Sequence, residues 1–213
     1  MATIEPKEYI LKNGTKIIVR PGVQDDADQL IMNANHFIEN GEGQVLIPGE
    51  LNLSLEDEYR WIENHRNQPT NILLVAEQNG NLLGHIDFYG SPRKRLQHTG
   101  HFGMGVRKEC HGLGVGRALL SRLIEWAQLN PVIEKINLQV IGNNSKAISL
   151  YRSLGFVEDG RKHREIKLED GTYIDDVFIQ PLFTAHRAGT LSEECAKAGH
   201  ALFRRRDALL SMT

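Results

Sequence analysis

Three closely spaced glycines precede a helix-like stretch in the segment HGLGVGRALL, residues 111–120. Glycine tolerates a positive φ and lets a ligand approach the backbone, so Gly112, Gly114 and Gly116 allow successive N–H groups to turn toward one anion. A helix that begins here adds unpaired N–H donors and the positive end of its dipole. The segment therefore predicts a phosphate or pyrophosphate site. By itself it also fits a plain connection between a strand and a helix.

Two common nucleotide-binding patterns do not fit this segment. A GxGxxG pattern that starts at Gly112 requires a glycine at position 117, which is Arg117. One that starts at Gly103 requires a glycine at position 108, which is Lys108. The P-loop pattern fails because the chain has no Gly-Lys-Ser or Gly-Lys-Thr. Both failures disfavour a nucleotide-binding module, which is one alternative function for the loop.

The stretch VRKECHGLGVGRALL resembles the acyl-CoA loop of the GNAT superfamily of N-acyltransferases. The family pattern is Arg or Gln, two residues, Gly, one residue, then Gly or Ala; here His111, Gly114 and Gly116 take those positions. His111 is a departure, because the charge of histidine depends on pH. The later stretch INLQVIGNNSKAISLYRSLGFVEDG resembles a second family motif, a strand, an Asn, a helix with Leu-Tyr, and Gly-Phe. The two motifs span residues 101–160 in the family's order.

The resemblance implies an enzyme that transfers an acetyl group from acetyl-CoA, its cosubstrate, to a primary amine. The amine would belong to a small molecule or to a peptide or protein N-terminus. Tyr151 stands where the family often has a general acid for the leaving thiolate. The residues implied to bind the coenzyme are Met104, Gly105, Val106, His111, Gly112, Leu113, Gly114, Val115, Gly116, Arg117, Asn144, Ala147 and Tyr151.

Helical spacing places Asn144, Ala147 and Tyr151 on one face, where a single ligand could meet them. In the alternative reading, Tyr151 packs in the core and Asn144 only caps the helix. The general base is not assigned, because RLQHTGHFGMGV, residues 95–106, holds no carboxylate. The candidates are His98 and His101 in that stretch and His85 and Asp87 in the preceding one, each of which also suits a structural role. No metal is expected.

Several charged segments have two readings. The basic residues 92–96, PRKRL, could meet the coenzyme's 3'-phosphate or an acidic acceptor, but a solvated turn is the simpler reading. A solvated segment is likewise the simpler reading for Arg204, Arg205 and Arg206. Several acidic residues could attract a cationic amine, namely Glu39, Glu42, Glu50 and those of the LEDE segment at 55–58. For the LEDE segment, a capped and exposed helix start is an equally good explanation.

The elements around these motifs alternate between strands and helices. Turn signals at Asn13-Gly14, Asn79-Gly80 and Asp170-Gly171 predict hairpins. Apolar spacing predicts helices after Asp25 or Asp26, after Ser54, from about Gly114 to Leu129, and after Asn144 or Ser145. The order indicates an α/β (mixed α+β) fold, a GNAT-like twisted mixed sheet flanked by helices. Residues 1–183 are expected to form this domain.

Length and composition bound the remaining possibilities. The chain has 213 residues, 40% hydrophobic and 24% charged, which is typical of a globular domain. A net charge of -2 gives no reason to expect nucleic acid or membrane partners. The two cysteines form no CxxC pair, and no apolar signal core or spanning segment is evident, so a cytoplasmic protein is expected. Residues 184–213 are expected to form a helical or frayed extension that packs on the domain or on a second subunit, as in a possible homodimer. A non-catalytic acyl-CoA sensor is the alternative to the enzyme.

Overall fold

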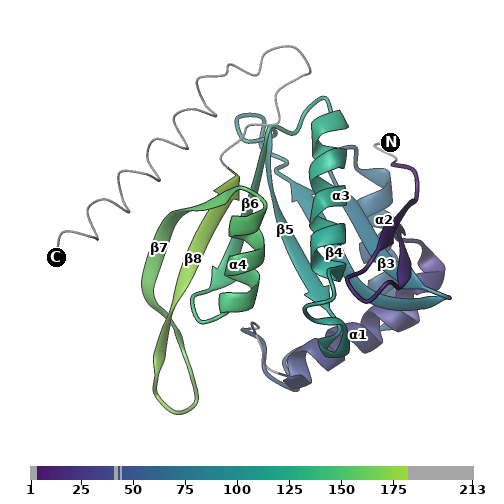
Figure 1. Cartoon of the computed structure of the whole chain (residues 1–213). Coiled ribbons are helices and arrows are strands. Elements are labelled where there is room, and N and C mark those ends of the chain that lie inside the picture. Colours follow the sequence, from purple (N-terminus) through teal and green to yellow (C-terminus); the bar gives the residue numbers. More distant parts are fainter. Residues whose placement is uncertain (1–3, 41–42, 44, 182–213) are drawn as a thin grey trace.

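The computed structural model describes residues 4–40, 43 and 45–181. These residues form one mixed sheet of eight strands, four α-helices and two short 3-10 turns (Figure 1). The strands are β1 (Lys7–Ile10), β2 (Lys16–Pro21), β3 (Ile72–Gln78), β4 (Asn81–Gly90), β5 (Thr99–Val106), β6 (Lys135–Ile141), β7 (Phe156–Lys167) and β8 (Tyr173–Pro181). The helices are α1 (Ala27–Asn40), α2 (Leu55–Asn67), α3 (Val115–Leu129) and α4 (Ser145–Ser153), and the turns are η1 (Gln24–Asp26) and η2 (Lys108–Cys110).

The strand order across the sheet is β1-β2-β3-β4-β5-β6-β8-β7, and every neighbouring pair except β5–β6 is antiparallel. The three expected hairpins are present. Their turns use positive φ at Gly14, Gly80 and Gly171, the conformation that glycine adopts without a steric cost. The expected fold class, a mixed sheet flanked by helices, is confirmed. The expected extension at residues 184–213 lies outside the described residues.

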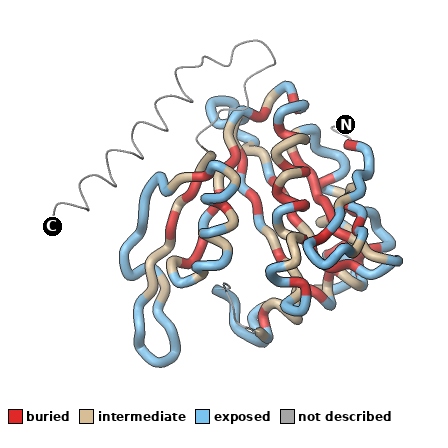
Figure 2. Tube along the Cα trace, viewed as in Figure 1, coloured by how far each residue is buried: buried red, intermediate tan, exposed pale blue. Residues whose placement is uncertain are grey.

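The helices cover both faces of the sheet (Figure 1). The larger core lies beneath α3 and α4 and includes Phe88, Phe102 and Leu119, whereas a smaller core beneath α1 and α2 includes Leu30 and Ile62. Figure 2 shows the buried residues concentrated along the central strands and α3. None of the described helices is long and apolar enough to cross a bilayer.

One side of α3 is more buried than its sequence indicates. Helical spacing places Arg122 on the polar side of α3, yet this residue is only 8% exposed. Its guanidinium donates to the Glu125 carboxylate at 2.6 Å and to the Glu5 carbonyl. The Lys7 ammonium donates to the same Glu125 side chain at 2.6 Å. The N-terminal segment therefore covers a face of α3 that helical periodicity alone assigns to solvent.

The sheet opens between β5 and β6. The two strands pair in parallel only from Thr99 opposite Lys135 to His101 opposite Asn137, and from Phe102 onward the described sheet pairs β5 with β4 alone. On the β4 side, Arg107 N–H donates to the Leu83 carbonyl at 2.9 Å. Antiparallel pairing alternates direction at each residue, so the residues of β5 that have odd numbers bond toward β4. The backbone groups of Phe102, Met104 and Val106 therefore face the opening.

Candidate active site

The glycine loop lies between the end of β5 and the start of α3. Gly112 and Gly114 have φ values of +76° and +111°, and Gly114 is the N-cap residue of α3. The first hydrogen bond of the helix runs from Ala118 N–H to the Gly114 carbonyl at 3.0 Å. The N–H groups of residues 115–117 consequently have no acceptor within the helix. These donors and the helix dipole are the features that the predicted anion site requires.

The neighbouring residues hold this loop in place. The His111 Nε2–H donates to the Val106 carbonyl at 2.9 Å, which ties the loop back to the end of β5. The Arg117 guanidinium donates to the Ser153 hydroxyl at 2.6 Å and so joins α3 to α4. The Leu113 carbonyl accepts from Lys12 N–H at 3.0 Å. The loop is thus bonded to β5 and to the β1–β2 turn, and the helix that follows the loop is bonded to α4.

Gly116 allows three elements to meet at the opening. A Cβ atom at this position would lie 3.2 Å from Leu150 Cδ2 of α4 and 3.5 Å from Met104 Cε of β5. The first distance is tighter than ordinary van der Waals contact. Glycine at this position therefore brings the start of α3, α4 and β5 close together without a clash.

The three predicted residues of α4 have distinct surroundings. The Asn144 side chain accepts from Ala147 N–H at 3.1 Å and caps the helix, while Ala147 packs against the main core. Tyr151 is 6% exposed. Its ring lies 5.8 Å from that of Phe102 and 6.1 Å from that of Phe156. Burial raises the pKa of Tyr151 to about 12. Asn144 and Tyr151 have the capping and core roles of the alternative reading, and Tyr151 also packs on a residue whose backbone faces the opening.

A carboxyl group reaches the other face of β5 from the neighbouring strand. Asp87 of β4 lies directly opposite Gly103 of β5, and a Cβ atom on Gly103 would come within 2.9 Å of Asp87 Oδ1. Burial raises the pKa of Asp87 to about 7, although backbone N–H groups, including that of Gly103, favour the carboxylate. Strand β5 itself offers no carboxylate, but its partner β4 places one over Gly103.

The histidine candidates for the general base divide into two groups. Burial lowers the pKa of His85 to about 4, so this imidazole is neutral at physiological pH and a weak proton acceptor. Its Nδ1 is buried and has no hydrogen-bond partner in the described residues. His101 is exposed and lies opposite Tyr89, and the His98 carbonyl accepts from the N–H of Lys135. These two lie near the start of β5, whereas His85 and Asp87 face its middle.

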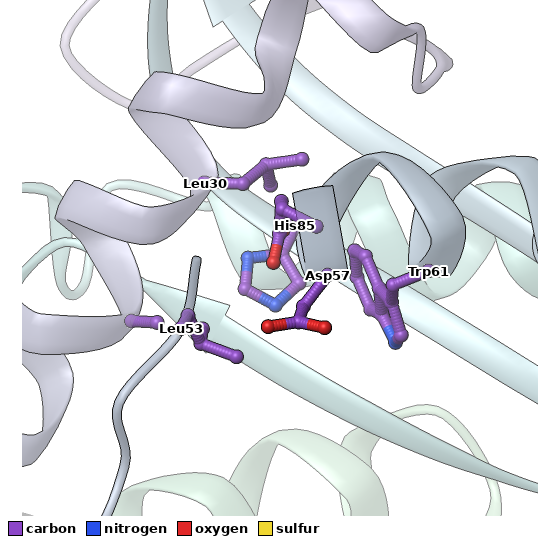
Figure 3. A pocket seen from close by; sticks show the side chains of 7 residues that line it. Leu30, Leu53, Asp57, Trp61 and His85 are labelled. Carbon is purple, nitrogen blue, oxygen red and sulfur yellow. The ribbon is translucent and has the colours of Figure 1, made fainter. Parts of the chain in front are cut away.

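A pocket of about 260 Å³ lies between α1, α2 and the sheet. Figure 3 shows the His85 ring and the Asp57 carboxylate turned toward a space bounded by Leu30, Leu53 and Trp61. The lining residues are Leu30, Ala34, Leu53, Asp57, Glu58, Trp61 and His85. Sequence patterns place Leu30 only in the core and give no role to Leu53 or Trp61, because a pocket wall has no local signature.

The acidic start of α2 is only partly as expected. Ser54 caps the helix, as its side chain accepts from Asp57 N–H at 3.1 Å. Glu58, however, is 5% exposed and lines the pocket, so the exposed reading of LEDE is wrong for this residue. Burial raises the pKa of Glu58 to about 7. The sequence does contain a signal for this burial. Glu58 is three residues after Leu55 and four before Ile62, a spacing that places it beside the apolar face of the helix.

Burial of Glu58 predicts a pH-dependent stability. The pKa of Glu58 is about 7 in the folded chain, against an ordinary 4.5. Burial favours the protonated form of Glu58. The contribution of this residue to the free energy of unfolding is therefore complete below about pH 4.5 and is lost as pH rises through about 7. Relative to Glu58→Gln, the free energy of unfolding of the unaltered chain should fall by roughly 2–3 kcal/mol between pH 5 and pH 8. Urea unfolding at both pH values measures it. Glu56→Gln, on the exposed side of α2, should show no such change, and a flat difference for Glu58→Gln would contradict the prediction.

The remaining charged residues are exposed or lie outside the described residues. Residues 92–96 are exposed in the β4–β5 connection, at the opposite end of β5 from the loop, about 25 Å along the strand. This position favours the solvated turn. Glu39 is exposed, and the exposed Glu50 accepts from Ile47 N–H at 3.1 Å. Glu42 and residues 204–206 are not among the described residues.

Comparison with known proteins identifies the family. The model of the acetyltransferase (GNAT) family matches residues 44–156. The L-amino acid N-acetyltransferase AaaT of Escherichia coli (strain K12) is 29% identical over 122 residues, which are 57% of this chain and 75% of that protein. The mycothiol acetyltransferase of Acidothermus cellulolyticus is 31% identical over 149 residues, but the match spans only 42% of its length.

Solved structures share the fold. A GNAT-family acetyltransferase from Streptococcus pneumoniae superposes with a TM-score of 0.74 at 27% identity, covering 77% of this chain and 98% of that one. A phosphinothricin acetyltransferase from Sinorhizobium meliloti, solved in complex with acetyl-CoA, has a TM-score of 0.70 over 86% of this chain and 92% of its own. At 19% identity it supports the fold alone. Because the family model matches more than half of its length, the chain belongs to the GNAT family of acetyltransferases, whose cosubstrate is acetyl-CoA.

Proposed function

We propose that this chain transfers the acetyl group of acetyl-CoA to the primary amine of a small molecule by direct attack. The observation that carries this proposal is the opening between β5 and β6. It leads from the glycine loop, along the unpaired edge of β5, to Asp87 on one face of the sheet and Tyr151 on the other. A GNAT acetyltransferase needs a place for the coenzyme and two proton-transfer groups near the thioester, and the opening can supply them.

The coenzyme would occupy the opening in an extended form. Its pyrophosphate would accept hydrogen bonds from the N–H groups of residues 114–117. Its pantetheine amides would pair with Met104 and with the Val106 N–H, much as an added strand pairs with a sheet edge. The Val106 carbonyl already accepts from His111. This arrangement assigns His111 the task of holding the loop, a role that needs no fixed positive charge. Asn144, Ala147 and Arg117 would border the coenzyme through α4 and its contact with α3.

The proposed reaction at the thioester transfers one acetyl group and requires the acceptor nitrogen to lose two protons. An acceptor ammonium gives one proton to Asp87, and the free amine attacks the thioester carbonyl while an N–H of β5 stabilises the oxyanion. The C–N bond forms and the C–S bond breaks. Tyr151 gives its proton to the departing sulfur, and the second proton that leaves the nitrogen passes through solvent to the Tyr151 phenolate and restores the phenol. The proton held by Asp87 is released to solvent. The raised pKa of Tyr151 keeps the phenol protonated at neutral pH and therefore able to donate.

A small acceptor is favoured by the pocket and by the related proteins. The pocket of about 260 Å³ beneath α1 and α2 suits a compact molecule. Its lining residue His85 is two positions from Asp87 on β4 and on the same face. AaaT of Escherichia coli is named for L-amino acids, which are small amines of this kind.

Calorimetry with acetyl-CoA, followed by thiol release with a panel of small amines, tests the proposal. Saturable binding at micromolar concentrations and amine-dependent release of coenzyme A are the expected results. Binding without release for any amine would instead favour an acyl-CoA sensor on the same fold. Absence of binding would overturn the coenzyme assignment.

Substitution of Gly114 tests the anion site directly. Its φ of +111° costs a non-glycine residue about 1–2 kcal/mol, and relief of that strain would turn the loop N–H groups away from the ligand. Gly114→Ala should weaken acetyl-CoA binding at least about tenfold by calorimetry, since that fold-change equals about 1.4 kcal/mol. Gly171→Ala, at φ +84° with no atom within 4 Å of the new Cβ, is the matched control. Equal affinities for the two variants would argue against the loop as the pyrophosphate site.

A further inference from the structure

The pocket beneath α1 and α2 contains a carboxyl group that the acetyl transfer does not use. Glu58 is 5% exposed and lines the pocket. In the described part of the chain its side chain makes no hydrogen bond or salt bridge, and burial is the sole cause of its raised pKa. An unpaired buried carboxylate is costly, and a cation that binds it offsets much of that cost.

The rest of the pocket lining provides no cation for Glu58. None of its seven residues is a lysine or an arginine. His85 is neutral, because burial lowers its pKa to about 4, and its buried Nδ1 has no partner among the described residues. Asp57 lies on the exposed side of the same pocket, where Ser54 lowers its pKa and keeps it ionised. The pocket therefore has a second carboxylate near its mouth.

The walls between these carboxyl groups are apolar. Leu30, Ala34, Leu53 and Trp61 contribute the remaining side chains, as the labelled residues in Figure 3 show for three of them. An apolar space with a carboxyl group inside matches an aliphatic chain that ends in an ammonium group. A neutral amino-acid side chain would fill the same space but leave Glu58 unpaired.

Glu58 also lies close to the proposed reaction centre. Burial raises the pKa of Tyr89, and the negative charges of both Asp87 and Glu58 raise it further. His85 lines the pocket together with Glu58, and Asp87 follows two positions later on the same face of β4, about 7 Å along the strand. This spacing lets one short molecule reach from Asp87 into the pocket that contains Glu58.

From this geometry, and resting on the function proposed above, we infer that the acceptor is a dicationic amine. It carries the primary amine that is acetylated and, on an apolar chain, a second ammonium that Glu58 binds inside the pocket. Aliphatic diamines and basic amino acids share this chemistry, and a substrate series separates them.

The first test compares matched amines with the unaltered full chain. The kcat/KM for 1,5-diaminopentane should exceed that for 1-aminopentane by about 10- to 100-fold, as expected for a hydrogen bond to a charged group. Lysine against norleucine gives the same comparison for amino acids. Whichever pair has the higher kcat/KM identifies the source of the second ammonium. Equal values within both pairs, or a preference for the uncharged member, would overturn the inference.

The second test removes the carboxylate. Glu58→Gln should reduce the ratio of kcat/KM for the diamine over the monoamine to near one, whereas Glu56→Gln, two residues away and exposed, should keep the ratio. An unchanged ratio in Glu58→Gln would also overturn the inference. If that variant does not fold, the comparison of amines on the unaltered chain decides alone. Acetylation of neutral amines only would reject the dicationic acceptor and keep the acetyl transfer, whereas no coenzyme A release with any amine would reject both.

Discussion

Tyr151→Phe should lower kcat by about 10²- to 10³-fold while changing the Kd of acetyl-CoA by about twofold at most. The substitution removes only the hydroxyl, so the ring keeps its contacts with Phe102 and Phe156. The thiolate would then leave without a proton donor, which affects the transition state rather than coenzyme binding. Steady-state rates with a saturating amine and calorimetry with acetyl-CoA measure the two quantities separately.

Tyr173→Phe provides the matched control. Tyr173 lies at the start of β8 and is exposed, so loss of its hydroxyl should leave both kcat and the Kd unchanged. Thermal unfolding of the two variants checks that neither has lost its structure. If Tyr151→Phe turns over at the rate of the unaltered chain, Tyr151 has only the packing role and the proton comes from another group.

Much of the fold is predictable from local sequence signals. Asn79-Gly80 forms the expected hairpin because both residues adopt positive φ, at +50° and +81°, which a tight turn requires. Asn144 caps α4 through a hydrogen bond to a residue three positions later. The glycine loop is similarly local, since its donors come from successive residues. Short-range signals of this kind are readable without knowledge of which strands are neighbours.

The rest of the site depends on contacts between distant segments. Asp87 lies opposite Gly103 only because β4 and β5 pair in one register, and a shift of one residue would turn Asp87 to the other face. Glu58 is buried by the packing of α2 against α1 and the sheet, although the residues around it are typical of an exposed helix start. Arg122 is buried for a related reason, since the N-terminal segment folds back over α3. Composition and periodicity do not encode these contacts.

Asp87 on β4 and Glu58 in the wall of the neighbouring pocket are two buried carboxyl groups with different proposed tasks. Burial raises the pKa of each to about 7. The Asp87 side chain lies over Gly103 of β5, the strand along which the thioester is proposed to bind, whereas Glu58 belongs to α2 and the pocket wall. Position rather than acidity therefore distinguishes the proposed base from the proposed binding group.

Asp87→Asn should lower kcat by about 10²- to 10⁴-fold. It should also remove a rise in kcat/KM with pH that the unaltered chain is expected to show. A general base acts when deprotonated, and the pKa of Asp87 is about 7, so activity should fall as pH drops below about 7 and level off above it. A monoamine acceptor is used for the profile, because Glu58 then has no second ammonium to bind and its own titration contributes little.

His101→Asn separates Asp87 from the exposed histidine on β5. If Asp87 is the base, the His101 variant keeps the rise in kcat/KM near pH 7 and the Asp87 variant loses it. The opposite result would assign proton removal to His101, whose position opposite Tyr89 also faces the α1 and α2 side of the sheet. Loss of the rise in both variants would indicate that the proton passes through both groups, and Asp87 alone would then be wrong as the acceptor of the amine proton.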